Sequence, residues 1–231
     1  MASETAALAI YLDAPLQSWG VSSRFQRRGT ESAPSKSGVL GLISAAMGID
    51  KHGPDESERL AHLSACRFSV FPVATGENPA PVLRLEDFHT VGGGYDRDDP
   101  VDKLRIARKA SGGVSTTIVT RRFYLEQARF AAVLEGDSGI LQKAADALED
   151  PIWGVWFGRK CCLPAAPLLP TLASSVSKAL DALLQKTGSR IVGEGRIEQD
   201  GYGAWHQPDQ PVSFGRREFI SRPLSRSSPG N

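Results

Sequence analysis

The chain has 231 residues, enough for one large domain or two small ones. Hydrophobic residues make up 41% and charged residues 23%, as in soluble globular proteins. The formal net charge is only +1, so the overall charge of the chain gives no indication of nucleic-acid binding. Segregated charge can still build a basic groove, although any one basic cluster taken alone is more often an ordinary solvated surface. The basic clusters lie at 24–28, 103–109, 121–122, 159–160 and 216–217.

Cysteine usage excludes two further classes of protein. Cys66, Cys161 and Cys162 are an odd count with one adjacent pair, which is no disulfide framework. They also lack other cysteines or histidines at the spacing of zinc ligands.

The N-terminus has no positively charged leader region, and no apolar run reaches membrane-spanning length. We therefore expect a reduced, cytoplasmic protein with no membrane segment, no bound metal and no cofactor.

The first part of the chain predicts alternating strands and helices. A short apolar run without helical periodicity opens it and reads as a buried strand. Ser35 is placed to cap the helix that follows Pro34, in which apolar residues recur at spacings of three and four. Before residue 92 the sequence predicts strands at 6–12, 66–74 and 82–91 and helices at 35–48 and 55–63.

The segment 92–115 has a different character. Glycines bracket a charged stretch with little apolar content, so it contributes little to a core and is either a mobile loop or a projecting arm. A strand pair is predicted at 116–124 and 129–134, followed by a helix at 139–148. This order of strands and helices predicts an α+β, ferredoxin-like domain of the RNA-recognition type over residues 1–150.

The composition changes after Pro151, where aromatic residues precede a proline-rich stretch. A helix is predicted at about 172–185 and a short strand near 212–220. The polar tail from about residue 222 is expected to be disordered. Residues 151–231 are thus predicted to form a smaller, β-rich C-terminal domain.

The candidate site begins where the helix at 35–48 opens with Ser-Lys-Ser. Free backbone N–H groups, two hydroxyls and one ammonium meet there, which favours binding of an anion such as phosphate. An arginine cluster and a tryptophan ring approach the same end, and this combination is typical of a site for single-stranded nucleic acid. The residues concerned are Trp19, Arg24, Arg27, Arg28, Lys36 and Ser37.

Each of these residues also has an ordinary structural explanation. Lys36 can be a surface lysine at a capped helix start, and Trp19 can be a core residue that closes a strand end. Arg159 and Lys160 can contact phosphate or can simply be solvated charges. A nucleotide triphosphatase loop is excluded, because Ser35 precedes Lys36 where that motif needs glycine.

Three segments, taken together, resemble the CasD family, the type I-E form of the fifth CRISPR-associated protein family. The opening at 16–49 runs from LQSWG to PSKSGVLGLISAAMGI, the centre at 120–134 reads TRRFYLEQARFAAVL, and a later block at 154–168 reads GVWFGRKCCLPAAPL. These segments keep the order and spacing of the family over most of the chain.

The resemblance implies a subunit of the CRISPR surveillance complex Cascade that binds the 5′ handle of the guide RNA and caps the assembly. Its implied partners are the guide RNA, a backbone subunit and the large subunit, with target DNA near the complex. The arm at 92–115 would be a thumb that packs across the guide RNA against the backbone subunit. The RNA-binding residues that we expect are Trp19, Arg24, Arg27, Arg28, Lys36, Ser37, Arg108, Lys109, Arg159 and Lys160.

The resemblance also implies binding without catalysis, because the type I-E branch leaves cleavage to a different subunit. The related type I-C branch cleaves precursor guide RNA, so a metal-independent endoribonuclease is the alternative. Such an enzyme needs a general base, for which His89 and His206 are the residues that could approach in space. A third hypothesis is a small-molecule enzyme that uses the helix start at Lys36 as a phosphate site.

Overall fold

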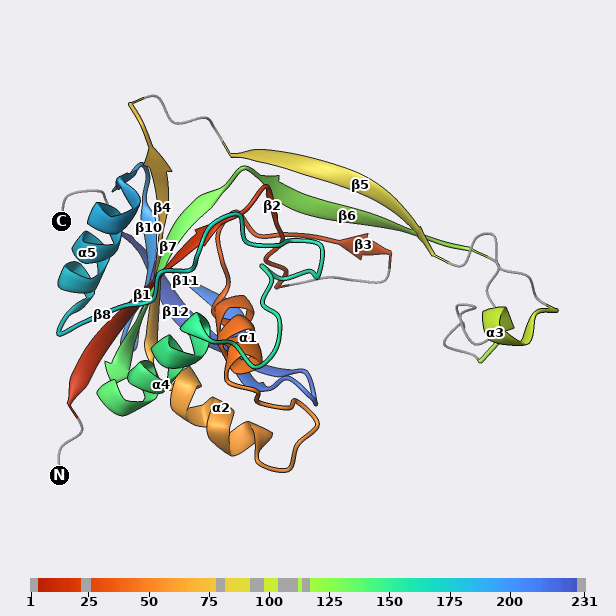
Figure 1. Ribbon diagram of the computed structural model, residues 1–231, viewed down its shortest axis with the longest axis horizontal. Helices are drawn as coiled ribbons and strands as arrows, with labels where there is room; N and C mark the ends of the chain where they lie inside the picture. Colours follow the sequence, from red (N-terminus) through yellow and green to blue (C-terminus); the bar gives the residue numbers. More distant parts are fainter. Residues whose placement is uncertain are drawn as a thin grey trace.

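The computed structural model describes residues 4–21, 26–77, 82–91, 98–103, 112–113 and 117–227. Within these ranges the chain forms a body and an arm that extends from it (Figure 1). The body is built on an eight-stranded sheet, and a four-stranded sheet leads into the arm. The fold is therefore mixed α+β, and its sheets are mainly antiparallel.

The centre of the large sheet is formed by strands β1 (Thr5–Asp13), β4 (Arg67–Thr75), β7 (Arg129–Asp137) and β8 (Thr171–Ala173). They lie in the order β4-β7-β1-β8, and every neighbouring pair is antiparallel. The predicted buried strand at 6–12 is confirmed, because β1 is buried on both faces from Ala7 to Leu12.

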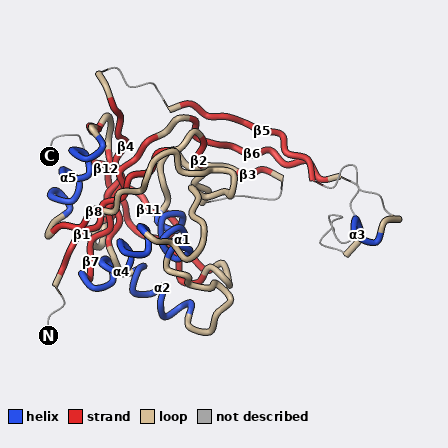
Figure 2. Tube along the Cα trace, in the orientation of Figure 1, coloured by secondary structure: helices blue, strands red, loops and turns tan. Residues whose placement is uncertain are grey.

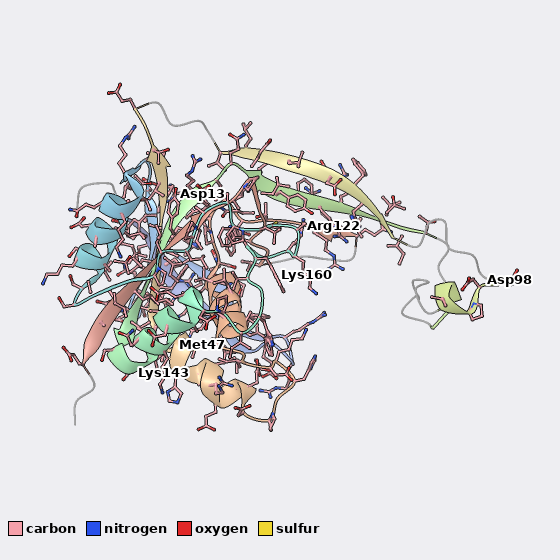
Figure 3. The ribbon with its side chains drawn as sticks, in the orientation of Figure 1. Asp13, Met47, Asp98, Arg122, Lys143 and Lys160 are labelled. Carbon is pink, nitrogen blue, oxygen red and sulfur yellow. The ribbon has the colours of Figure 1, made fainter. Side chains whose placement is uncertain are left out.

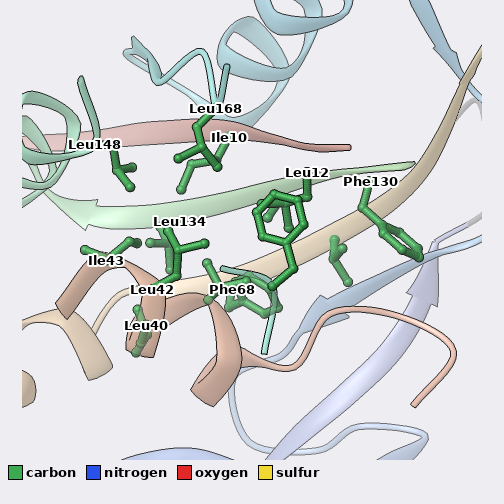
Figure 4. Close-up of a cluster of buried hydrophobic side chains, with 14 of the residues drawn as sticks. Ile10, Leu12, Leu40, Leu42, Ile43, Phe68, Phe130, Leu134, Leu148 and Leu168 are labelled. Atoms are coloured by element: carbon green, nitrogen blue, oxygen red, sulfur yellow. The ribbon is translucent and has the colours of Figure 1, made fainter. Parts of the chain in front are cut away.

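Helices cover both faces of this sheet, which explains why β1 is apolar from Ala6 to Leu12. On one face α1 (Lys36–Ala46), α2 (Glu56–Ser64) and α4 (Ser138–Glu149) enclose the main core (Figure 4). On the other face α5 (Val176–Thr187) covers β1 and β7. Among the described residues, no helix has the length and apolar character needed to span a bilayer.

The C-terminal strands join the same sheet. They are β9 (Ser189–Ile191), β10 (Gly195–Glu198), β11 (Trp205–Ser213) and β12 (Glu218–Ser227). β10 pairs with β4, and β12 lies between β10 and β11. Strands from both sides of residue 150 are thus hydrogen-bonded to each other, and the predicted division into 1–150 and 151–231 stays a prediction.

The expected disorder from about residue 222 is wrong for residues 222–227. They continue β12, in which Arg222 and Leu224 are buried. The polar composition of this segment concealed the strand, because its one buried cation is stabilised by carboxylates that lie elsewhere in the chain. Residues 228–231 lie outside the described residues.

The arm is built on β5 (Leu83–Val91) and β6 (Ile118–Glu126), which pair along nine residues. Two short strands, β2 (Leu16–Gln17) and β3 (Arg27–Arg28), also pair with β6 near the body. Figure 2 shows β3, β5 and β6 running together away from the body. The short helix α3 (Pro100–Lys103) lies beyond them, and most of the segment 92–115 lies outside the described residues.

The prediction that 116–124 and 129–134 pair with each other is wrong. β6 and β7 follow one another directly, yet β6 pairs with β2, β3 and β5 while β7 pairs with β1 and β4. Gln127, with a positive φ of 52°, and Ala128 separate the two strands. Alternation of apolar residues indicates a strand but not its partner, and each of these strands finds its partners elsewhere in the chain.

Candidate nucleic-acid interface

A hollow of about 270 Å³ lies between the start of α1, strand β3, the loop at 158–159 and the β11–β12 hairpin. Arg28 and Arg159 line it, and so do the rings of Phe214 and Phe219. Cations beside aromatic rings suit the phosphates and bases of single-stranded nucleic acid. The other lining residues are Ser18, Trp19, Gly20, Gly29, Ser35, Ser37, Gly38 and Gly158.

Trp19 lines this hollow but is not an exposed platform for a base. The residue is only 1% exposed, and its ring stacks on Phe157 with 5.8 Å between centroids. Its indole N–H donates to Oε1 of Gln17 at 2.9 Å. A Cβ at Gly38 would stand only 2.7 Å from the ring, so α1 packs directly on the tryptophan. The predicted stacking role of Trp19 is therefore wrong, and the residue is part of the core.

Lys36 is likewise buried rather than presented to a ligand. The residue is 0% exposed, and its Nζ lies 3.0 Å from both carboxylate oxygens of Glu198. Burial lowers the pKa of the Lys36 ammonium, although the charge of Glu198 opposes this shift. The predicted phosphate contact at Lys36 is wrong, because a carboxylate of β10 already neutralises the ammonium.

The start of α1 is also satisfied from within the chain. The backbone N–H of Lys36 donates to Oδ2 of Asp209 at 2.8 Å, and the N–H of Gly38 donates to the Ser35 hydroxyl at 3.2 Å. The Ser35 cap is thus confirmed. Asp209 occupies the position that the sequence assigned to an external anion, since a carboxylate at a helix N-terminus is itself favourable. Ser37 is half-buried at the edge of the hollow, and its RNA contact stays a prediction.

Arg159 connects the two sides of the hollow. Its guanidinium donates to the backbone carbonyl oxygens of Phe123 at 3.2 Å and of Arg28 at 2.8 Å. It also lies over the Tyr124 ring, with 4.5 Å between Cζ and the ring centroid. The side chain is half-buried, so it fixes β3 against β6 and adds positive charge to the hollow.

The position of Arg159 depends on the glycine before it. Gly158 has a φ of +90°, and a Cβ there would stand 1.8 Å from the carbonyl oxygen of Ser18. The N–H of Ser18 donates to the carbonyl of Phe157 at 3.1 Å. Only glycine fits this close approach of two backbones, which brings the loop at 158–159 beside β2 and β3.

Arg27 and Arg28 are exposed on β3, where they pair in register with Arg121 and Arg122 of β6. Neighbouring residues of a strand face opposite sides of the sheet, whereas partners on adjacent strands face the same side. Arg27 and Arg121 therefore lie on one side of the small sheet, and Arg28 and Arg122 lie on the other. On one side Arg27 lies over the Phe123 ring, 4.9 Å from its centroid. The other side carries Arg28, which lines the hollow.

Lys160 is exposed and lies over the Trp156 ring, with 5.5 Å between Nζ and the ring centroid. Figure 3 shows Lys160 and Arg122 on the side of the body from which the arm extends. The predicted contacts of Lys160, Arg27 and Arg28 with RNA are compatible with these exposed positions and stay predictions. Arg24, Arg108 and Lys109 lie outside the described residues.

Sequence reasoning missed Phe214 and Phe219. It placed one strand over 212–220, whereas the structure has a hairpin whose turn at 214–217 separates β11 from β12. Gly215 between two hydrophobic stretches was the turn signal that could have revealed it. A hairpin brings two aromatic rings five positions apart into contact, with centroids 6.3 Å apart and planes at 64°.

A second, larger hollow of about 550 Å³ lies beside β10 and β11. Its arginines are already engaged: Arg226 pairs with Glu194 at 2.9 Å, and Arg196 donates to the Ser32 hydroxyl at 2.6 Å. Glu31 also lines it, so its acids oppose an anionic backbone. We therefore take the smaller hollow as the candidate site.

Neither histidine considered as a general base lies in the candidate site. His206 lines the larger hollow, and His89 lies on β5, where its carbonyl accepts a bond from Thr120. Tyr124, whose ring lies under Arg159, has its Oη 3.6 Å from Sγ of Cys161. Burial raises the pKa of the Tyr124 hydroxyl, which makes it a poorer base at neutral pH.

Comparison with known proteins places the chain in a family. Residues 7–223 match the family model described as CRISPR-associated protein (Cas_Cas5). The Cascade subunit CasD of the CRISPR system of Escherichia coli K12 is 30% identical over 227 residues, covering 93% of this chain and 92% of the relative.

Two solved structures are also similar. A chain of a CRISPR RNA-guided surveillance complex aligns with a TM-score of 0.70 and 27% identity, covering 96% of this chain and 90% of that chain. A crystal structure of a Cas protein aligns with a TM-score of 0.62 and 26% identity, covering 96% and 94%. The fold, the length and the sequence agree, and the chain belongs to the CRISPR-associated Cas5 family, of which CasD is a member.

Proposed function

We propose that this chain is a subunit of a Cascade-type CRISPR complex and that it binds the 5′ handle of the guide RNA at the hollow beside Arg28. The names of its relatives support the assembly: one is a Cascade subunit, and another comes from an RNA-guided surveillance complex. The observation that carries the proposal is the hollow itself, which joins Arg28 and Arg159 to aromatic rings. It offers the two contacts that an unpaired strand makes, to phosphates and to base faces.

The charges around the hollow give the RNA a path. Arg28 is exposed and lines the hollow beside the start of α1, and Arg27 is exposed on the other side of β3. Lys160 is exposed next to Arg159 in the chain. Exposed arginines and lysines contact phosphates without reading bases, so they set the register of the strand. Arg159 contributes its charge while two backbone carbonyls hold its guanidinium in place.

The topology of the body agrees with this function. The order β4-β7-β1-β8, with helices between β1 and β4 and between β7 and β8, supports a ferredoxin-like arrangement of the body. The pairing of β5 with β6 supports the arm as a thumb that reaches a neighbouring backbone subunit. The large subunit, with target DNA near the complex, and a cytoplasmic location complete the proposal.

We propose binding without catalysis. The hollow is lined by arginines, serines, glycines and aromatic rings, and the histidines considered as bases lie elsewhere. Incubation of the purified protein with precursor guide RNA in EDTA tests this. A specific cut would establish the alternative, a metal-independent endoribonuclease.

Co-purification tests the assembly. The tagged chain, expressed with its genomic neighbours, is expected to carry a uniform guide RNA with a protected 5′ handle. A monomer without nucleic acid would contradict the proposal, and tight mononucleotide binding by that monomer would support a small-molecule enzyme instead. That enzyme could not use Lys36 as first expected, because Glu198 holds this lysine.

Arg28→Ala tests the hollow in the same preparation. Loss of one phosphate contact should weaken handle binding and lower the slope of log K against log salt by about 0.7. Arg226→Ala is the matched control, because Arg226 is an exposed arginine that lines the larger hollow. Equal effects of the two substitutions would contradict the assignment of the site.

A further inference from the structure

We propose that Phe214 and Phe219 form a stacking platform for one unpaired base of the bound RNA, and that Glu56 is the positioning residue of this platform. The inference rests on the proposed function and adds to it a named base contact. It assigns to the C-terminal hairpin the role that the sequence assigned to Trp19.

The two rings differ in exposure. Phe214 is half-buried, and its Cζ lies 3.6 Å from the place where a Cβ of Gly41 would stand, so the ring rests on α1. Phe219 is 41% exposed and meets Phe214 edge to face. An edge-to-face pair fixes both rings while it leaves one face of the outer ring accessible. Phe214 therefore anchors the platform and Phe219 presents it.

The platform shares the hollow with the cations. Phe214 and Phe219 come to it from the β11–β12 hairpin, and Arg28 and Arg159 come from β3 and the loop at 158–159. A nucleotide whose phosphate lies at Arg28 can then place its base on Phe219. The volume of about 270 Å³ is below the roughly 300–1,000 Å³ of pockets for drug-sized ligands, and it suits one base rather than a stack of several.

Glu56 fixes the hairpin turn from the neighbouring helix. Its carboxylate accepts from the Ser213 hydroxyl at 2.8 Å and from the Phe214 N–H at 2.6 Å. Ser213 Oγ in turn accepts from the N–H of Arg216 at 3.1 Å. The residue is only 3% exposed, so these bonds are shielded from water. One carboxylate of α2 thus sets where the backbone of Phe214 stands.

The experiment uses the full chain, assembled with its neighbouring subunits on a synthetic guide RNA in place of the co-purified one. The probe is this guide RNA, with the recovered sequence and with 2-aminopurine at each purine position of its 5′ segment in turn. Stacking on an aromatic ring quenches this fluorophore, so one position should be quenched by the wild-type protein. Phe219→Ala should abolish the quench and raise the Kd roughly 5- to 100-fold, while Phe219→Trp should retain both.

The salt dependence separates stacking from phosphate contact. Phe219→Ala should leave the slope of log K against log salt unchanged, whereas Arg28→Ala should lower it. Phe88→Ala is the matched control, because Phe88 is an exposed phenylalanine on β5 of the arm, 65% exposed. It should leave the quench unchanged.

Ser213→Ala and Glu56→Ala test the positioning role. Both should weaken the quench without changing the salt slope, and Glu56→Gln, which keeps an acceptor for the Phe214 N–H, should restore part of it. If the Glu56 variants fail to fold, Ser213→Ala decides, since it removes only the two hydrogen bonds of the Ser213 hydroxyl, to Glu56 and from the Arg216 N–H, with little change in volume. An unchanged quench in Ser213→Ala would overturn the positioning role.

The possible failures are distinguishable. If Arg28→Ala weakens binding but Phe219→Ala changes neither the quench nor the affinity, the platform is wrong and the proposed function stands. If the wild-type complex carries no RNA, both are wrong. If Phe219→Ala instead releases a neighbouring subunit while the quench persists, the hairpin is a protein-docking surface and the platform is again wrong.

Discussion

The Lys36 ammonium, at the first residue of α1, lies 3.0 Å from both carboxylate oxygens of Glu198, which is 162 positions away on β10. Glu198 also accepts from the N–H of Phe68 and from the guanidinium of Arg222. Arg222 in turn bonds Asp209, which also accepts from the backbone N–H of Lys36 and from the side-chain amide of Gln207. Two cations and two carboxylates thus form a closed, neutral cluster that joins the first helix to the C-terminal strands.

Lys36→Ala should destabilise the protein strongly. Removal of the Lys36 ammonium leaves two carboxylates, Glu198 and Asp209, around the single cation Arg222, and loss of one partner of a buried ion pair costs about 3–5 kcal/mol in comparable cases. Lys36→Met keeps most of the side-chain volume, so a loss of similar size in this variant would show that charge, not packing, is responsible. Urea unfolding measures both variants. Wild-type stability in Lys36→Ala would contradict the cluster as described.

Stability should fall in acid partly because of Glu56. Burial alone would raise the pKa of Glu56, but hydrogen bonds from Ser213, Phe214 and Ser57 outweigh it and hold the pKa below its ordinary value. The unfolded chain therefore takes up this proton at a higher pH than the folded one. The contribution is complete above the ordinary glutamate pKa of about 4.3 and is lost as pH falls through the lower folded value.

The measurement is the free energy of unfolding of wild type and Glu56→Gln between about pH 6 and pH 3. The wild-type curve should fall more steeply below about pH 5, since only the wild type has this proton to bind. Parallel curves would show that Glu56 does not carry the acid sensitivity.

Gly158→Ala should be damaging, although the residue is exposed. A side chain there is strained at a φ of +90° and collides with the Ser18 carbonyl, so the loss should exceed about 1 kcal/mol. Gly201→Ala is the matched control: φ is +84° there, but nothing lies within 4 Å of the added Cβ. A thermal melt compares the two. Equal shifts would mean that the contact with Ser18 adds nothing to the backbone strain.

Shortening the arm should leave the body folded. β5 pairs with β6, and β6 also pairs with the short strands β2 and β3 near the body. Replacing residues 92–117 by a tight turn therefore removes none of these backbone hydrogen bonds. The unfolding midpoint of the isolated chain should stay near that of the wild type, while assembly with the neighbouring backbone subunit should fail. A complex of normal composition would contradict the thumb.

Local signals predicted the elements well. The Ser35 cap, the apolar spacing of the following helix and the apolar run at 6–12 all correspond to observed elements, because they depend on neighbours within a few residues. The pairing of β6 and β7 failed for the opposite reason. Their true partners lie far away in the chain, and alternation carries no information about which strand is the partner.

The sequence brought together some residues of the candidate hollow and misjudged others. Arg28 and Ser37 of the opening segment and Arg159 of the later block line one hollow, and their contacts with RNA stay predictions. Lys36 and Trp19 were misassigned because the groups that bury them, on β10 and in the loop at 157, cannot be located from local sequence. A lysine at a helix start has the same local signature whether it faces solvent or a distant glutamate.

Gln17 lies at the junction between the two sheets. Its side-chain amide donates to the carbonyl of Ala128, at the two-residue break between β6 and β7, and its oxygen accepts from the Trp19 indole under the hollow. Only Gln127 and Ala128 lie between β6 of the arm and β7 of the body. Any rotation of the arm there must move a residue that also supports the floor of the hollow, so the angle of the arm and the shape of the hollow are mechanically coupled.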